Sequence, residues 1–241
     1  MTASRNMWIA VAVATALVWT APGMAAPDGR AGQAAAFIQG LGAELLVIQA
    51  GAGDGAGDGA VAARSARLED LIRRGFDLDL TSQLVLGKYW SRASQAHRQA
   101  FGKLFAQYLV HSYARYLKAY RVETLDIVSS NPAGKSDFLV ESRVEGAEAN
   151  DSANPVWRLR LRDDGFKIID VHVDGISLAL TERSQFGSVI RRNGFDGMLS
   201  ALRKRVAGPP EAAADSPLDL HPASLFTSPN VSKIELLLRQ R

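Results

Sequence analysis

The spacing of apolar residues changes near Val122 from a helical period to a period of two, and this change restricts the possible folds. In the clearest alternating segment, Trp157, Leu159 and Leu161 occupy one face and three arginines the other. A strand with one apolar face belongs to a sheet that is covered on one side only. Four segments have this pattern, which predicts four antiparallel strands: Val122–Val128, Phe138–Glu145, Val156–Arg162 and Phe166–Val173.

Helical spacing precedes and follows these strands. The longest predicted helix begins at a Ser94 cap and has an aromatic apolar face, which is either solid core or the lining of a cavity. Thr81-Ser82 and Thr181 or Ser184 are the other expected caps. The predicted helices lie around Ala34–Ile48, Leu68–Ile72, Leu84–Trp90, Ser94–Tyr120, Phe186–Ile190 and Phe195–Val206, the last two separated at Asn193-Gly194. Because helices must cover the apolar face of the sheet, we expect an α+β fold with a curled antiparallel sheet of about four strands against a helical layer.

The N-terminus has the three parts of a secretory signal peptide. Arg5 is followed by an uncharged apolar run over Met7–Val18 and by small residues up to Ala26. The run is shorter than the roughly 20 residues of a membrane span, although an uncleaved anchor is the alternative. We therefore expect cleavage after residues 1–26, one domain over 27–207, and a mostly disordered tail over 208–241 that ends in a possible short helix.

Composition and motifs provide little support for catalysis. The chain has no cysteine, a formal charge of +3, and no basic stripe of the kind that binds nucleic acid. Its four histidines lack metal-ligand spacing, and no nucleophile elbow or phosphate loop is present. Asp170, His172 and Asp174 alternate on one strand and are interpreted as a solvated face, because same-face positions lie about 7 Å apart. Gly51–Gly59 is expected to be a flexible loop.

Two ordered blocks of sequence resemble a known family. They are Leu84-Val85-Leu86-Gly87-Lys88-Tyr89-Trp90 with the following helix, and Asp170–Leu178 with Phe186–Leu202. Together they resemble the periplasmic phospholipid-shuttle family typified by MlaC, also described as toluene-tolerance or ABC-transport auxiliary proteins. The resemblance covers roughly Phe37–Val206.

The resemblance implies a periplasmic lipid carrier without a cofactor or catalytic residues. Acyl tails of a phospholipid would lie in an internal apolar cavity between sheet and helices. The carrier would exchange lipid between an outer-membrane lipoprotein–porin complex and an inner-membrane ABC transporter with a periplasmic lipid-binding ring, and so maintain outer-membrane lipid asymmetry. A hopanoid or other apolar ligand is an alternative cargo.

Fourteen residues are candidates for the cavity lining on this reading. They are Leu84, Tyr89, Phe101, Phe105, Tyr108, Leu109, Leu139, Trp157, Leu159, Ile169, Val171, Val173, Ile176 and Leu178. Two other functions are considered: a periplasmic adaptor of the same fold without a lipid, and an enzyme acting on an apolar substrate. A cavity too small for an acyl chain would favour the adaptor.

Overall fold

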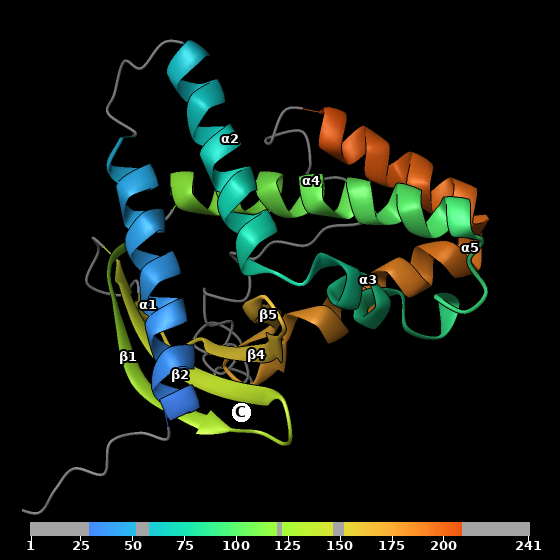
Figure 1. Ribbon diagram of the computed structural model, residues 1–241. Helices are drawn as coiled ribbons and strands as arrows, with labels where there is room; N and C mark the ends of the chain where they lie inside the picture. Colours follow the sequence, from blue (N-terminus) through green and yellow to red (C-terminus); the bar gives the residue numbers. More distant parts are fainter. Residues whose placement is uncertain (1–28, 52–57, 120–121, 147–151, 209–241) are drawn as a thin grey trace, which may run out of the picture.

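The computed structural model describes residues 29–51, 58–119, 122–146 and 152–208 (Figure 1). The predicted signal peptide, most of the predicted glycine-rich loop and the tail after Gly208 lie outside these residues. The elements are α1 (Gly29–Ala50), α2 (Asp58–Gly75), α3 (Leu78–Leu86), the 3-10 helix η1 (Gly87–Tyr89), α4 (Gln95–Ala119), β1 (Val122–Pro132), β2 (Asp137–Gly146), β3 (Ser152–Ala153), β4 (Val156–Arg162), β5 (Gly165–Val173), β6 (Ile176–Ser177) and α5 (Leu178–Ala207).

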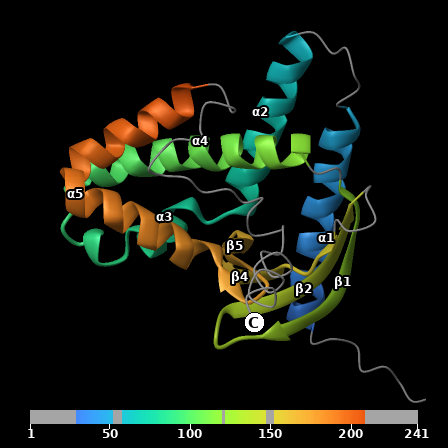
Figure 2. The same ribbon diagram turned by 180° about the vertical axis from the view of Figure 1, so that it is seen from behind.

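The fold is α+β, as the sequence predicts. The sheet has the order β1-β2-β4-β5-β6 with β3 paired to β2, and every strand pair is antiparallel. Its four long strands are the predicted ones, and β3 and β6 add two residues each. Helix α1 lies across one face of the sheet, while α3, α4 and α5 form a second body beside it (Figures 1 and 2). Each part has its own buried apolar cluster.

Three aromatic residues in the first part of α4 are solid core. Phe101, Phe105 and Tyr108 are almost completely buried and pack around Phe186 of α5, with ring centroids 5.2–6.1 Å from it. Ser94 caps α4 as predicted, because its Oγ accepts a hydrogen bond from the His97 backbone N–H at 3.1 Å. These three residues therefore pack as core, and they line neither of the two cavities described below.

The arginine face of β4 is confirmed, but the predicted facing of β2 is wrong at Leu139. Trp157, Leu159 and Leu161 pack in the sheet core together with Phe138 and Val140. Because side chains alternate across a strand, Leu139 between those last two residues lies on the opposite face. Its backbone partner across the ladder is Arg158, which also belongs to that outer face.

A bulge changes the facing of β5. Arg158 pairs with Asp170 and Leu159 pairs with Ile168, so Ile169 is an extra residue in the ladder. An extra residue reverses the alternation, because the side-chain period of a strand is two. Ile168 and Val171 therefore both belong to the sheet core. Ile169 is buried outside that core, which corrects the expectation that it faces inward with Val171.

Asp170 is buried and organises the start of α5, contrary to the predicted solvated face. Its carboxylate accepts hydrogen bonds from Ser177 Oγ at 2.6 Å and from the Ala179 backbone N–H at 3.0 Å. His172 Nε2 lies 3.0 Å from the same group. Ser177, rather than Thr181 or Ser184, then caps α5 by accepting from the Leu180 N–H. The block Asp170–Leu178 thus joins the sheet to the last helix.

Asp170→Asn should lower the free energy of unfolding by about 2–3 kcal/mol, the value of hydrogen bonds to a buried charge. The amide keeps the shape but presents donors to groups that are themselves donors. Asp174→Asn is the matched control, because Asp174 is exposed and its φ of 51° is one that asparagine tolerates. Urea unfolding of the two variants measures the difference, and equal midpoints would contradict this role for Asp170.

The cap of α3 differs from the sequence prediction, whereas the interruption within α5 agrees with it. Asp77, not Thr81 or Ser82, caps α3 by accepting a hydrogen bond from the Leu80 N–H at 2.8 Å. The predicted interruption at Asn193-Gly194 is confirmed as a kink inside α5, where Gly194 has φ 70° and ψ −178°. Only glycine adopts that conformation without strain, since any Cβ would clash with the backbone.

Candidate functional site

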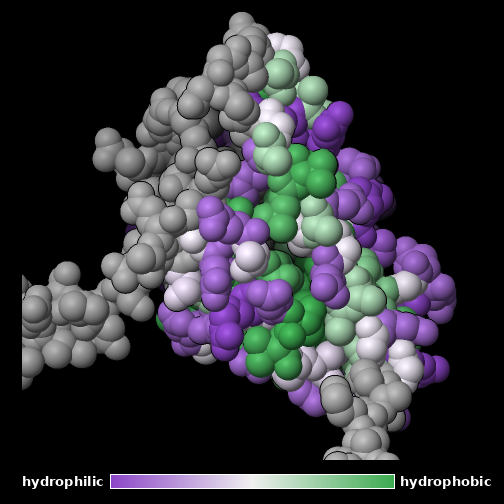
Figure 3. Space-filling view, turned by 90° about the vertical axis from the view of Figure 1, so that its left-hand side faces the viewer, coloured by the Kyte–Doolittle hydropathy of each residue, from purple (hydrophilic) through white to green (hydrophobic). Residues whose placement is uncertain are grey.

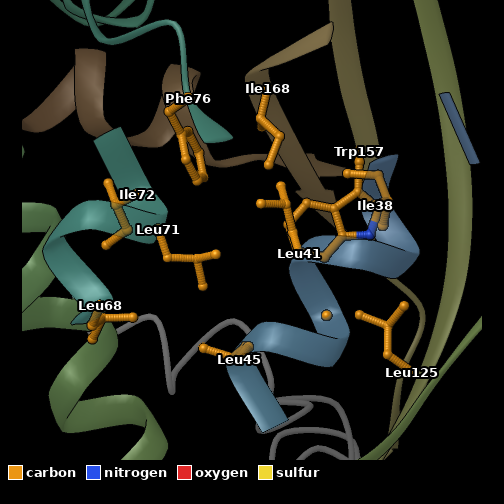
Figure 4. A pocket seen from close by; sticks show the side chains of 11 residues that line it. Ile38, Leu41, Leu45, Leu68, Leu71, Ile72, Phe76, Leu125, Trp157 and Ile168 are labelled. Atoms are coloured by element: carbon orange, nitrogen blue, oxygen red, sulfur yellow. The ribbon is translucent and has the colours of Figure 1, made fainter. Parts of the chain in front are cut away.

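An entirely apolar pocket lies between the α1–α2 hairpin and the inner face of the sheet. Figure 4 shows side chains from these elements pointing into one common space. No polar side chain lines it among the residues described. Its lining residues are Ile38, Leu41, Gly42 and Leu45 of α1, Leu68, Leu71 and Ile72 of α2, Phe76, and Leu125, Trp157 and Ile168 of the sheet.

Close packing and one hydrogen bond position the walls of this pocket. Gly42 lets α1 approach β1, because a Cβ there would lie 3.1 Å from Leu125 Cδ1. The indole N–H of Trp157 donates to Ser142 Oγ at 2.9 Å. Ser142 is completely buried. The polar edge of the tryptophan is thereby satisfied, and its ring is left as apolar wall.

On the outer face of the sheet, charged residues connect β2 to β4, the strand that carries Trp157. Asp137 of β2 accepts hydrogen bonds from Arg158 and Arg160 of β4. Burial alone would raise the pKa of Asp137, but hydrogen bonds from Arg160 and Arg158 outweigh it and hold that pKa below its usual range. Asp137 therefore remains ionised at neutral pH, and its ion pairs hold β2 and β4 together on the face of the sheet opposite the Trp157 side chain.

The pocket is small as it stands. Its volume is about 60 Å³, roughly that of two water molecules in the liquid. Pockets that bury a drug-sized ligand have about 300–1,000 Å³. A space of this size holds an acyl tail only after the walls of the pocket have moved apart.

The hydrogen bonds that hold the hairpin lie at its base. Ser130 Oγ of β1 donates to the Ala31 carbonyl at 2.7 Å, near the start of α1. The Asp77 N–H donates to the Ile168 carbonyl at 2.9 Å, just after α2 ends. The rest of the hairpin contacts the sheet through the apolar pocket side chains, and α2 also packs on α4, where Leu68 and Ile72 form a buried cluster with Val110.

Only one of the fourteen sequence candidates lines this pocket, and it is Trp157. Leu159, Val171, Val173 and Leu178 pack in the sheet core. Ile176 is half exposed, because β6 lies at the sheet edge. Leu139 and Ile169 face away, as described above. The remaining six pack with α4 and α5: Leu84, Tyr89, Phe101, Phe105, Tyr108 and Leu109.

Most pocket residues come from α1 and α2, which sequence reasoning did not select. One signal was available in α1, whose apolar residues extend beyond a single face. This helix is long and apolar enough to cross a membrane, judged by length and composition alone. In the fold it packs on β1, and apolar side chains gather on the side of the molecule where α1 lies (Figure 3). No group of three His, Cys, Asp or Glu side chains suited to a metal occurs in the described ranges.

Comparison with known proteins agrees with this architecture. The model of the MlaC protein family matches residues 47–204, well over half of the chain. The chain belongs to the MlaC family. The match includes α2 and the sheet strands of the pocket, while most of α1 precedes it.

Two relatives of this MlaC-family chain are informative. The intermembrane phospholipid transport system binding protein MlaC of Haemophilus influenzae is 24% identical over 138 residues, which are 55% of this chain and 64% of that protein. The chain thus matches somewhat less than two thirds of this relative's length. A phospholipid-binding protein from Ralstonia solanacearum, solved in complex with a phospholipid, superposes with a TM-score of 0.59. It is 23% identical, and the match covers 73% of this chain and 97% of that structure. The likeness shows the shared fold.

Proposed function

We propose that this MlaC-family protein is a periplasmic carrier that holds the acyl tails of a phospholipid in the pocket between the α1–α2 hairpin and the sheet. The observation that carries the proposal is the wholly apolar lining of that pocket. An enzyme acting on an apolar substrate would need convergent polar groups, and the lining provides none among the described residues. The named relatives, which bind phospholipid, support the same choice of ligand.

Binding would require the hairpin to open about its base. The contacts broken are apolar ones around a cavity of about 60 Å³, and the incoming tail replaces them. Each buried methylene contributes about 0.8 kcal/mol. Because the methylenes of the tail replace the contacts that are broken, the net cost of opening is smaller than the loss of helix–sheet packing alone. The exposed ion pairs of Arg74 with Glu44 and Asp70 lie within the hairpin, so they stay intact when the hairpin moves as a unit.

The free energy of an acyl tail in the carrier and in a bilayer bears on the direction of transport. A bilayer offers acyl tails the same apolar environment as the pocket, so carrier and membrane are nearly balanced. We infer that direction comes from the complexes that deliver and accept lipid, an outer-membrane lipoprotein–porin complex and an inner-membrane ABC transporter with a lipid-binding ring. Export through a cleaved signal peptide over residues 1–26 belongs to the same proposal.

The small cavity favours one second candidate, an adaptor of the same fold that binds partners and holds no lipid. Native mass spectrometry of the protein purified without detergent, followed by lipid extraction, separates the two. The carrier should retain about one phospholipid per chain, or take it up from vesicles. A hopanoid would keep the carrier and change its cargo. A protein that is empty and also refuses lipid from vesicles would overturn the carrier and favour the adaptor.

A further inference from the structure

A second groove lies between α3, η1 and the first half of α5, away from the apolar pocket. Its volume is about 370 Å³, and no residue lines both cavities. In Figures 1 and 2, α3 and this part of α5 lie on the opposite side of the molecule from α1. The groove is lined by Leu86, Lys88, Tyr89, Leu180, Arg183, Ser184, Gly187 and Arg191.

Three cations line this groove without a carboxylate partner. Within the described part of the chain, no ion pair includes Lys88, Arg183 or Arg191. Arg183 is held in place, since its Nε donates to the Leu84 carbonyl at 2.6 Å. Lys88 Nζ lies 5.4 Å from the centre of the Tyr89 ring. Three unpaired cations around one concave surface favour an acidic ligand.

The groove also has an apolar rim and a closely packed floor. Leu180, which lines it, is 55% exposed, and Ile176 nearby on β6 is 50% exposed. In the floor, Leu86 and Tyr89 are buried, and Gly187 packs so closely that a Cβ would lie 3.3 Å from the Tyr89 ring. A floor that is already packed loses little conformational freedom when a ligand binds. The matching ligand is an extended segment with carboxylates and aliphatic side chains.

The chain itself contains such a segment just after α5. Residues 209–232 include Glu211, Asp215 and Asp219 and no lysine or arginine. Leu218 and Leu220 flank the last of these carboxylates. This stretch therefore combines carboxylates with aliphatic residues, which suits a groove with three cations and an aliphatic rim.

The segment is long enough to reach the groove. Arg191 lies 16 residues before Ala207 on α5, a path of at most about 24 Å at 1.5 Å per helical residue. Asp219 lies 11 residues beyond Gly208, a reach of about 36 Å for extended chain at roughly 3.3 Å per residue. Such a short tether gives an effective concentration in the millimolar range.

We propose that the segment Asp215–Leu220 binds in cis in the groove formed by Lys88, Arg183 and Arg191. The segment then occupies the groove by default. An acidic surface of another protein reaches these cations only by displacing it. The inference rests on charge and reach alone and does not depend on lipid carriage.

Disulfide trapping tests the proposal, because the chain has no native cysteine. Ser216→Cys places a thiol in the segment, and Ser184→Cys places one in the groove. The control is Ser200→Cys, an exposed position on α5 that is nearer to Gly208 along the chain. A tail without a binding site would react with the thiol at position 200 at least as fast. We expect the 184–216 disulfide to form at least about tenfold faster, within the range that tethered binding gives.

Charge-reversal variants test whether the cations of the groove attract the carboxylates of the segment. Lys88→Glu with Arg191→Glu should remove the tenfold preference, as should about 1 M salt, where the Debye length is about 3 Å. Adding Asp215→Lys and Asp219→Lys should restore it. The matched control is Arg203→Glu with Lys204→Glu, exposed cations of α5 outside the groove, which should leave the preference intact. Thermal unfolding verifies that each variant is folded.

Two results would overturn the proposal. The first is equal rates of disulfide formation at positions 184 and 200. The second is a preference for position 184 that survives reversal of both groove charges and high salt. In either case the groove would be open to an acidic partner other than the tail, and lipid retention measured on the same variants would report separately on the carrier function.

Discussion

Leu45→Glu is expected to lower the phospholipid retained per chain by at least about tenfold. Leu45 lines the apolar pocket near the end of α1 and is only partly buried, so the variant can fold with its carboxylate in water. Lipid binding would force that carboxylate into a space without a polar partner, at a cost of several kcal/mol. Since about 1.4 kcal/mol is a tenfold change in affinity, the bound state should be largely lost.

Val47→Glu is the matched control for this prediction. Val47 lies half a turn further along α1, is 66% exposed and does not line the pocket. The measurement is phospholipid phosphorus per chain after purification without detergent, with thermal unfolding to compare stabilities. If Leu45→Glu keeps the wild-type lipid content, or if both variants lose lipid equally, the tails do not occupy this pocket.

The second large effect concerns a buried carboxyl group at the α4–α5 interface. Tyr108 donates a hydrogen bond to Glu182 Oε1 at 3.3 Å. The Glu182 Oε2 atom is buried without a hydrogen-bond partner in the described part of the chain. Burial raises the pKa of Glu182 to about 8, and Tyr108 and Arg205 offset part of that rise.

A raised pKa makes stability fall as pH rises. Below pH 4.5 the carboxyl group is protonated in both the folded and the unfolded chain. Between pH 4.5 and pH 8 the unfolded chain loses this proton while the folded chain keeps it, so the free energy of unfolding decreases. At about 1.4 kcal/mol per pH unit, the full decrease is on the order of 5 kcal/mol. Glu182→Gln cannot ionise, and its stability should lack this decrease.

Urea unfolding at several pH values between 5 and 8 checks the expectation. The stability of Glu182→Gln relative to the wild type should rise steadily over this range. Glu145→Gln, at an exposed position on β2, should follow the wild type at every pH. Parallel curves for Glu182→Gln and the wild type would show that Glu182 ionises normally in the folded protein.

The fold class follows from local patterns that need no tertiary information. The alternation of Trp157, Leu159 and Leu161 with arginines holds in the structure because a strand of a one-sided sheet has to separate those residue types. The Ser94 cap and the interruption at Gly194 are also local, since each depends on one side chain or on its absence.

The candidate site could not be assigned in the same way. A one-residue bulge at Ile169 reversed the facing of half of β5, and no sequence signal marks it because Ile168 and Ile169 are chemically identical. The aromatic face of α4 is indistinguishable in sequence from a cavity lining. Only the contact of Phe101, Phe105 and Tyr108 with Phe186, far along the chain, makes that part of the face solid core.

Residue order along single segments was enough to predict the long strands, most of the helices, the α+β class and the family resemblance. The tertiary structure decided which apolar faces meet one another and which leave a space between them. Helices α1 and α2 enclose the pocket because Gly42 permits close approach to β1 and because Asp77 joins the end of α2 to β5. A cavity is a property of several elements at once, so its lining appears only when those elements are packed together.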